Sequence, residues 1–134
     1  MKIEDIRDDL CFLSGREVIL FGSYVTGDFT PESDVDVAII TRSSDRRSMM
    51  ETRISAAGRA PERYDIQVLE ALPLLVIGSI LDQHEVLFGD PLEIGLYLYR
   101  YRRIWGDYQH RVEIPTIREM RGASVSGPRG QSLQ

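Results

Sequence analysis

The chain has 134 residues, which is enough for one domain with a modest hydrophobic core. Its hydrophobic content of 43% and charged content of 28% are typical of a soluble globular protein. The net charge of -5 argues against strong nucleic-acid binding, because nucleic-acid phosphates require basic patches, but it leaves room for a small nucleotide bound through a metal ion.

The compartment expected from the sequence is the cytoplasm. Cys11 is the single cysteine, so no intrachain disulfide can form, and the apolar residues 10–13 around it predict a small core residue. Met1 leads into a charged segment rather than a signal peptide. The most apolar stretch, residues 72–81, is too short to cross a membrane, so no membrane association is expected.

The N-terminal part of the chain predicts a helix, a strand and a second, short helix. Apolar residues at helical spacing predict a helix over residues 3–13, and Gly15 is expected to end it. Residues 17–21 are apolar and partly β-branched, so they predict a buried strand. A short helix is then expected to begin at Ser23 and to stop by Gly27.

The middle of the chain predicts a second strand and a longer helix. Residues 28–33 are polar and predict a loop, and residues 34–41 predict a strand. Residues 43–58 predict a helix, for which Ser43 or Ser44 is the expected N-cap.

The C-terminal half predicts a third strand followed mainly by helices. Residues 62–70 predict a strand, residues 73–83 a helix that begins with proline, and residues 85–89 a short extended piece. A long helix is expected from Pro91, with Pro115 ending or kinking it. Its apolar residues follow one helical stripe: Ile94, Leu98, Tyr101, Trp105, Tyr108 and Val112.

Strands and helices alternate along the chain, which predicts an α/β fold with helices packed on a sheet. We assign residues 1–120 to a single domain. Residues 121–134 are rich in Gly, Ser and Gln and poor in apolar residues, so they predict a disordered tail.

The turn at Gly22-Ser23 follows the first strand and opens the short helix. A glycine turn into a helix start exposes backbone N–H groups that can bind a phosphate, and glycine lets that phosphate approach closely. The hydroxyl of Ser23 adds another donor. A helix cap without any ligand is the alternative interpretation of these two residues.

Three aspartates are the candidate metal ligands. Asp34 and Asp36 lie two residues apart in a strand, so both carboxylates share one face, opposite to Val35 and Val37. Two neighbouring acids repel each other unless they are solvated, protonated or bridged by a cation such as Mg²⁺. Asp65 interrupts the third strand, and if that strand lies beside the second, the three carboxylates converge. Such a set can hold two Mg²⁺ ions for phosphoryl or nucleotidyl transfer. Solvent-facing strand residues are the alternative.

The combined motif resembles a known superfamily. Gly22-Ser23, ten intervening residues and Asp34-Val35-Asp36 together resemble the nucleotidyltransferases of the DNA polymerase beta superfamily. The chain looks most like the minimal nucleotidyltransferases of prokaryotes, which include antitoxins whose partner is a HEPN-domain ribonuclease toxin. The resemblance covers residues 20–68 well and the remainder more weakly.

The resemblance implies a fold, an activity and a set of roles. The fold would be a small mixed sheet flanked by helices, here with a long C-terminal helix, and residues 1–120 would be the nucleotidyltransferase domain. Gly22 and Ser23 would contact the nucleotide phosphates, Asp34 and Asp36 would bind Mg²⁺, and Asp65 would be the third catalytic and metal-binding carboxylate. The reaction would transfer AMP from ATP to a hydroxyl, which in the antitoxin group is a tyrosine of the HEPN toxin.

The chain departs from many relatives directly after Gly-Ser. Those relatives carry a basic residue where this chain has Tyr24-Val25-Thr26, so one side-chain contact to phosphate is expected to be missing. The chain is also short, which predicts that a partner protein supplies acceptor contacts. The long helix could provide the docking surface or a homo-oligomer interface, or its stripe could simply pack on the sheet.

Two other functions remain open at this point. A non-catalytic antitoxin or scaffold with the same fold would neutralise its partner by contact alone. A transferase acting on a small molecule, as in antibiotic-modifying relatives, would need acceptor contacts from this one domain.

Overall fold

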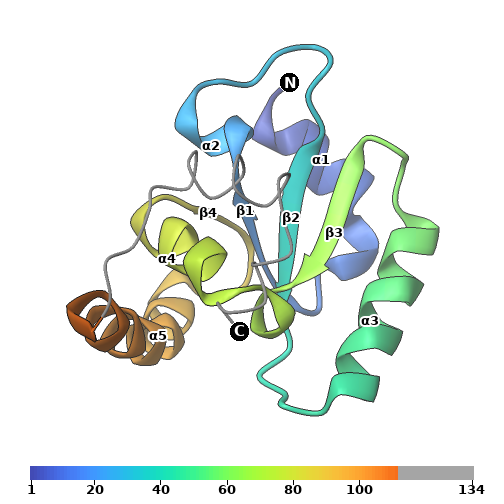
Figure 1. Cartoon of the computed structure of the whole chain (residues 1–134). Helices are drawn as coiled ribbons and strands as arrows, with labels where there is room; N and C mark the ends of the chain where they lie inside the picture. The colour runs from blue at the N-terminus through green and yellow to red at the C-terminus, as the bar shows by residue number, and fades with distance from the viewer. Residues whose placement is uncertain (112–134) are drawn as a thin grey trace, which may run out of the picture.

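A four-stranded mixed sheet forms the centre of the molecule (Figure 1). The computed structural model describes residues 1–111, with side chains described up to residue 108. The strands lie in the order β3-β2-β1-β4. β1 is antiparallel to both of its neighbours, whereas β2 and β3 are parallel. Their bounds are Glu17–Phe21 for β1, Val35–Ile40 for β2, Tyr64–Val68 for β3 and Glu85–Phe88 for β4.

Helices cover both faces of this sheet. α1 and α3 lie on one face, and α4 and α5 lie on the other (Figure 1). α2 is a single turn between β1 and β2, and two short 3-10 turns, η1 and η2, complete the set. The bounds are Ile3–Asp9 for α1, Cys11–Leu13 for η1, Ser23–Thr26 for α2, Arg46–Arg59 for α3, Leu69–Ala71 for η2, Leu74–Asp82 for α4 and Pro91–Arg111 for α5.

The alternation of side chains along the strands creates two cores, one on each face of the sheet. In β2, Val35, Val37 and Ile39 are fully buried towards α1 and α3. Ala38 and Ile40 are buried on the opposite face, against α4 and α5. Within β2, Asp36 alone is not buried, because its side chain lies at the end of the second face, beyond the apolar packing. The predicted α/β fold with a small mixed sheet is confirmed.

Two local predictions were wrong. The N-cap of α3 is Asp45, whose carboxylate accepts a hydrogen bond from the Ser48 N–H at 3.0 Å. The hydroxyl of Ser43 instead accepts from the Asp45 N–H, so it shapes the turn before the helix. The first helix is also shorter than predicted, because Leu10 leaves helical geometry and a 3-10 turn follows.

Cys11 is exposed, contrary to the core position predicted for it. Ile6, Leu10 and Leu13 are spaced four and three residues apart, and all three fill the core beneath the sheet. The position directly after Leu10 therefore turns outward. Cys11 has apolar neighbours in the sequence but is not buried, because consecutive side chains of a 3-10 turn point in different directions.

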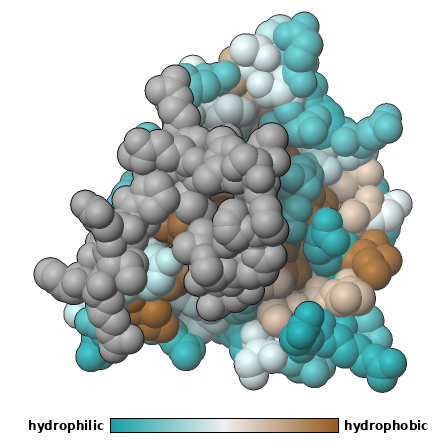
Figure 2. Space-filling view, in the orientation of Figure 1, coloured by the Kyte–Doolittle hydropathy of each residue, from teal (hydrophilic) through white to brown (hydrophobic). Residues whose placement is uncertain are grey.

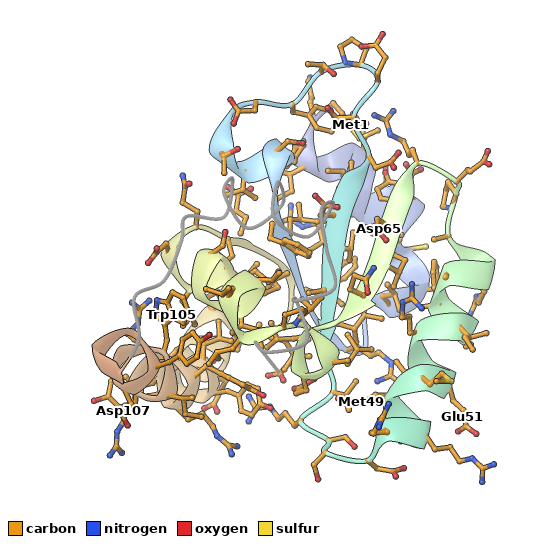
Figure 3. All side chains as sticks on the ribbon, in the orientation of Figure 1. Met1, Met49, Glu51, Asp65, Trp105 and Asp107 are labelled. Carbon is orange, nitrogen blue, oxygen red and sulfur yellow. The ribbon has the colours of Figure 1, made fainter. Side chains whose placement is uncertain are left out.

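The long helix α5 packs on α4 through its predicted apolar stripe. Ile94 and Leu98 are buried, and Trp105 lies so close to Gly78 that a Cβ there would be 2.6 Å from the Trp105 ring (Figure 3). The Arg102 guanidinium donates to the Leu81 carbonyl at 2.9 Å. The described part of the stripe is thus mainly internal packing. Val112, Pro115, the boundary at residue 120 and the tail 121–134 lie outside the described residues.

No helix among the described residues combines the length and apolar character that a membrane crossing requires.

Candidate active site

The β1–α2 turn brings the backbone of Gly22 directly against Asp36. Gly22 has φ 75° and ψ -151°, a conformation that is essentially restricted to glycine. A Cβ at this position would overlap Asp36 Oδ2 and would lie 3.0 Å from Asp36 Cγ. The glycine is therefore required twice, once for the turn and once to leave space for the carboxylate.

The single-turn helix α2 presents its first N–H groups at this turn. The Val25 and Thr26 N–H groups both donate to the Gly22 carbonyl, at 3.0 and 3.1 Å. Ser23 and Tyr24 precede these donors, at positions where N–H groups have no acceptor within the helix. Gly27 ends the turn with a left-handed φ of 95°. Because α2 is so short, any attraction for phosphate comes from these N–H groups and the Ser23 hydroxyl rather than from a helix dipole.

The three predicted aspartates lie at one end of the same sheet face. Asp36 pairs with Phe21 across β1 and with Asp65 across β3, so it stands between Gly22 and Asp65. Asp34 directly precedes β2 and, by strand alternation, shares the face of Asp36. Asp34 and Asp65 are exposed and Asp36 is half-buried. The expectation that the third strand lies beside the second is confirmed, and Figure 3 labels Asp65 on β3.

The donor set suits Mg²⁺ that is completed by a substrate. Among the described residues, no group of three or more His, Cys, Asp or Glu side chains is arranged to hold a metal ion. Mg²⁺ is commonly bound by one or two carboxylates together with substrate phosphates and water. Two neighbouring aspartates, with glycine leaving space beside one of them, fit that requirement. An all-protein metal cage does not form here.

The family model for the nucleotidyltransferase domain matches residues 3–96. The chain belongs to the nucleotidyltransferase domain family. The resemblance inferred from Gly22-Ser23 and Asp34-Val35-Asp36 is confirmed at the level of this family, and the matched residues contain every predicted site residue.

Curated relatives agree with this family. A Methanocaldococcus jannaschii protein named as a candidate protein adenylyltransferase is 35% identical over 95 residues, covering 71% of this chain and 73% of that protein. A second protein of the same organism and description is 43% identical over 51 residues, covering 38% of this chain and 52% of that protein.

Solved structures share the fold of this nucleotidyltransferase. A toxin–antitoxin structure with AMP-PNP gives a TM-score of 0.62 at 18% identity, covering 95% of this chain and 100% of that one. A structure of the tri-AMPylated Shewanella oneidensis HEPN toxin in complex with the MNT antitoxin gives a TM-score of 0.56 at 18% identity, covering 93% and 96%.

Tyr24 lies directly after Gly22-Ser23, where the resemblance predicts that a phosphate contact from a basic side chain is missing. The Tyr24 hydroxyl donates to the Met1 carbonyl at 2.9 Å, and its ring packs edge-on against Phe29 with centroids 5.2 Å apart. Burial, followed by the nearby charges of Glu85 and Glu4, raises the pKa of Tyr24. Tyr24 is thus a neutral packing residue and does not replace the missing positive charge.

Two residues near the three aspartates were not identified as site residues from the sequence. Gln67 Nε2 donates to Asp65 Oδ1 at 3.0 Å, and Arg53 Nε donates to the Ile66 carbonyl at 3.2 Å. Gln67 could have been found, because a residue two positions from Asp65 in a strand shares its face. Arg53 could not, because its approach to β3 depends on how α3 packs across the sheet.

Proposed function

We propose that this nucleotidyltransferase moves AMP from ATP, with Mg²⁺, to a tyrosine hydroxyl of a partner HEPN-type toxin, and so acts as a cytoplasmic antitoxin. The observation that carries the proposal is the position of Asp36 between Gly22 and Asp65. This arrangement joins a phosphate-binding turn, a carboxylate pair and an acceptor-side acid at one end of the sheet. The names of the relatives and the titles of the solved structures support the choice of AMP and of a toxin acceptor.

Different residues act on the donor ATP and on the acceptor hydroxyl. The N–H groups at Gly22 and Ser23 bind the triphosphate and orient its α-phosphorus. Asp34 and Asp36 would hold Mg²⁺, with Asp65 as a further ligand, and the metal would neutralise phosphate charge. Asp65 lies on the acceptor side and receives the proton of the attacking hydroxyl. A new P–O bond to the acceptor forms, the bond between the α-phosphate and the β-phosphate breaks, and pyrophosphate leaves.

The outer face of α5 provides the surface that we assign to the toxin. Leu92, Leu96 and Tyr99 are spaced four and three residues apart and are 69%, 63% and 59% exposed. They lie on the side of the helix opposite to Ile94 and Leu98, which pack inside. A helix that is apolar on two sides needs two packing partners, and α4 and the sheet supply only one. A helical partner would cover the second.

Replacing Leu96 with Asp tests this surface. We expect at least a tenfold weaker complex with the toxin and an unchanged melting temperature, because the side chain is exposed. Glu93→Gln, on the same helix, is the control and should bind normally. Equal affinity of both variants would place the toxin elsewhere on the molecule.

Transfer of label tests the activity itself. The protein is incubated with ATP labelled at the α-phosphate, Mg²⁺ and the product of the neighbouring gene. Label should appear on the partner, and Asp36→Ala or a chelator should reduce it at least a hundredfold. Glu51→Ala is the matched control, because Glu51 projects outward from α3 and away from the acids (Figure 3). Equal labelling by the wild type and Asp36→Ala would refute the activity.

Contact alone is the second candidate mechanism, favoured by the same exposed face of α5. The double variant Asp34→Ala/Asp36→Ala separates the two mechanisms in cells that express the toxin. Loss of protection indicates catalysis, whereas full protection indicates neutralisation by binding.

A further inference from the structure

Asp34 differs from the other two aspartates because it lies outside the strands. Asp36 belongs to β2 and Asp65 to β3, and the two residues pair across these strands. The backbone pairing of a strand fixes the direction of its side chains. Asp34 instead directly precedes β2, at the end of the loop formed by residues 28–33. The direction of its carboxylate therefore depends on what holds this loop against the sheet.

Loop 28–33 is closed by its own hydrogen bonds but is largely exposed. The Ser33 N–H donates to the Thr30 carbonyl at 2.9 Å, and the Thr30 N–H donates to the Ser33 hydroxyl at 3.0 Å. Phe29 and Ser33 are partly buried, whereas the other residues of the loop are exposed. The loop projects at the top of the molecule in Figure 1, where the surface in Figure 2 is mainly hydrophilic or neutral. These internal bonds fix the shape of the loop but do not attach it to the sheet.

Arg63 attaches the chain to the sheet on both sides of Asp34. The Arg63 carbonyl accepts a hydrogen bond from the Val35 N–H at 2.9 Å. The guanidinium of Arg63 donates through Nη2 to the Ser33 carbonyl at 3.5 Å, which is a long hydrogen bond. Arg63 itself directly precedes β3, two residues before Asp65. One residue at the start of β3 thus contacts the backbone before and after Asp34.

Aromatic packing holds the Arg63 guanidinium in this position. The guanidinium carbon lies 5.7 Å from the centroid of the Phe29 ring, within the range of a cation–π contact. Phe29 in turn packs edge-on against Tyr24 of α2. The Nε of Arg63 is buried and finds no hydrogen-bond partner among the residues that the structure describes. A buried donor without a partner is unfavourable, and the contacts with Phe29 and Ser33 offset this cost.

We propose that Arg63 is a positioning residue that orients the Asp34 carboxylate for Mg²⁺. Its side chain holds the Ser33 carbonyl and thereby sets the direction in which the chain enters β2 at Asp34. Groups that orient a metal ligand in this way commonly affect metal affinity strongly without touching the metal. This inference rests on the proposed transferase function, because that function makes Asp34 a metal ligand.

Binding of Mn²⁺ tests the proposal without any turnover. The Kd of the full-length protein for Mn²⁺ is measured by electron paramagnetic resonance, with a non-hydrolysable ATP analogue present. Arg63→Met should raise this Kd about tenfold or more, because the carboxylate of Asp34 is no longer held in place. Loss of a positive charge alone would act in the opposite direction and strengthen cation binding. The sign of the change therefore separates positioning from simple electrostatics.

Arg59→Met is the matched control. It removes the same charge and a comparable aromatic contact, since the Arg59 guanidinium lies 4.5 Å from the centroid of the Phe12 ring. Its contact is with η1 rather than with loop 28–33, so the Kd for Mn²⁺ should stay within about twofold of the wild type.

Two further measurements separate positioning from general damage to the fold. In an Asp34→Asn background, Arg63→Met should change the Kd by less than about twofold, because the carboxylate that Arg63 positions is absent. Hydrogen exchange at the Val35 N–H should remain slow in Arg63→Met, because this group donates to the backbone carbonyl of residue 63. Slow exchange shows that β2 and β3 remain paired.

Three results would overturn the proposal. The first is Mn²⁺ binding by Arg63→Met that is as tight as binding by Arg59→Met, or tighter. The second is an equally large loss of affinity in the Asp34→Asn background. The third is fast exchange at Val35 in Arg63→Met, which would make Arg63 a structural residue of the strand pair.

The test also distinguishes this inference from the proposed function. If Asp34→Asn leaves the Kd for Mn²⁺ unchanged while label transfer succeeds, Asp34 is not a metal ligand, so the inference fails and the transfer function stands. If the Mn²⁺ results are as expected but no label is transferred, the function fails and the positioning role of Arg63 stands.

Discussion

The two ends of the β-sheet both collect acidic side chains but treat them differently. At the end near residue 41, the Glu70 carboxylate accepts hydrogen bonds from the N–H and hydroxyl of Thr41, the Arg42 N–H and the Tyr97 hydroxyl, at 2.7 to 3.1 Å. Arg42 also pairs with Glu17 through two nitrogens and stacks on the Tyr97 ring. At the other end, Asp34, Asp36 and Asp65 share one face beside a glycine turn.

Stability and chemistry are located at opposite ends of this small sheet. Glu70 accepts hydrogen bonds from Thr41 and Arg42, which directly follow β2, and from Tyr97 of α5, so its network attaches the long helix to the sheet. The aspartates instead lie side by side, an arrangement that like charges disfavour unless solvent or a cation compensates. One end is closed by its own hydrogen bonds, and the other is suited to an external ligand.

Gly22→Ala should have the largest effect on the aspartate end. The new Cβ would overlap the Asp36 carboxylate, and φ 75° with ψ -151° strains any L-residue. We expect at least a hundredfold loss of label transfer and a loss of about 1–3 kcal/mol in unfolding free energy, measured by urea denaturation. Gly15→Ala is the control, because a Cβ there meets no atom within 4 Å. Normal activity of Gly22→Ala would show that the turn at Gly22 is not needed for nucleotidyl transfer.

Glu70→Ala should have the largest effect at the other end, and on stability alone. Several donors lose their acceptor, so the free energy of unfolding should fall by about 1–3 kcal/mol. Transfer activity per folded molecule should stay within twofold of the wild type. Glu51→Ala should change the unfolding free energy by less than about 0.5 kcal/mol. A strong loss of activity in folded Glu70→Ala would show that the two ends are coupled.

The pH dependence of stability should also come from the Glu70 end. Burial, followed by the hydrogen bond to Glu70, raises the pKa of Tyr97 above its ordinary value of 10.0. The unfolded tyrosine therefore ionises first, so stability is fully present below pH 10 and falls as pH rises above it. Tyr97→Phe should lose about 0.5–1.5 kcal/mol at pH 7 but should decline less steeply from pH 9 to 11 than the wild type. Tyr99→Phe, on the exposed side of α5, is the control, and a decline parallel to the wild type in Tyr97→Phe would contradict this origin.

The Arg42–Glu17 pair should contribute least. Both side chains are partly exposed, at 42% and 24%, so solvent screens their attraction. A double-mutant cycle with Arg42→Ala and Glu17→Ala should give a coupling free energy below about 1 kcal/mol. A larger value would mean that this end depends on charge as well as on hydrogen bonds.

The strand pattern made much of this predictable from the sequence. Alternation placed Asp34 and Asp36 opposite to Val35 and Val37, and β1 began and ended where expected. The N-cap of α3 was harder to predict, because Ser43, Ser44 and Asp45 can all cap a helix and local hydrogen bonds selected Asp45. The fold was therefore predictable mainly from local signals, such as the alternation of apolar residues and the glycine turns.

Long-range contacts were not predictable in the same way. The register that pairs Asp36 with Asp65 required knowing that β2 and β3 are parallel neighbours, which the sequence left conditional. The approach of Arg53 to Ile66 and the four donors on Glu70 join residues from separate elements. Such contacts depend on how the helices pack across the sheet. The periodicity of apolar residues predicts individual helices and strands but not this packing.

Mapping of nucleotide binding by backbone amide chemical shifts tests the central claim most directly. A non-hydrolysable ATP analogue is added with Mg²⁺ to the wild type and to Asp36→Asn. The shifts should concentrate at Gly22, Ser23 and Asp36, extend to Asp65, and largely disappear in the variant, while Thr41 and Glu70 stay unchanged. Shifts centred on Thr41 and Glu70, or equal shifts in both proteins, would contradict the division of the sheet into a stabilising end and a nucleotide-binding end.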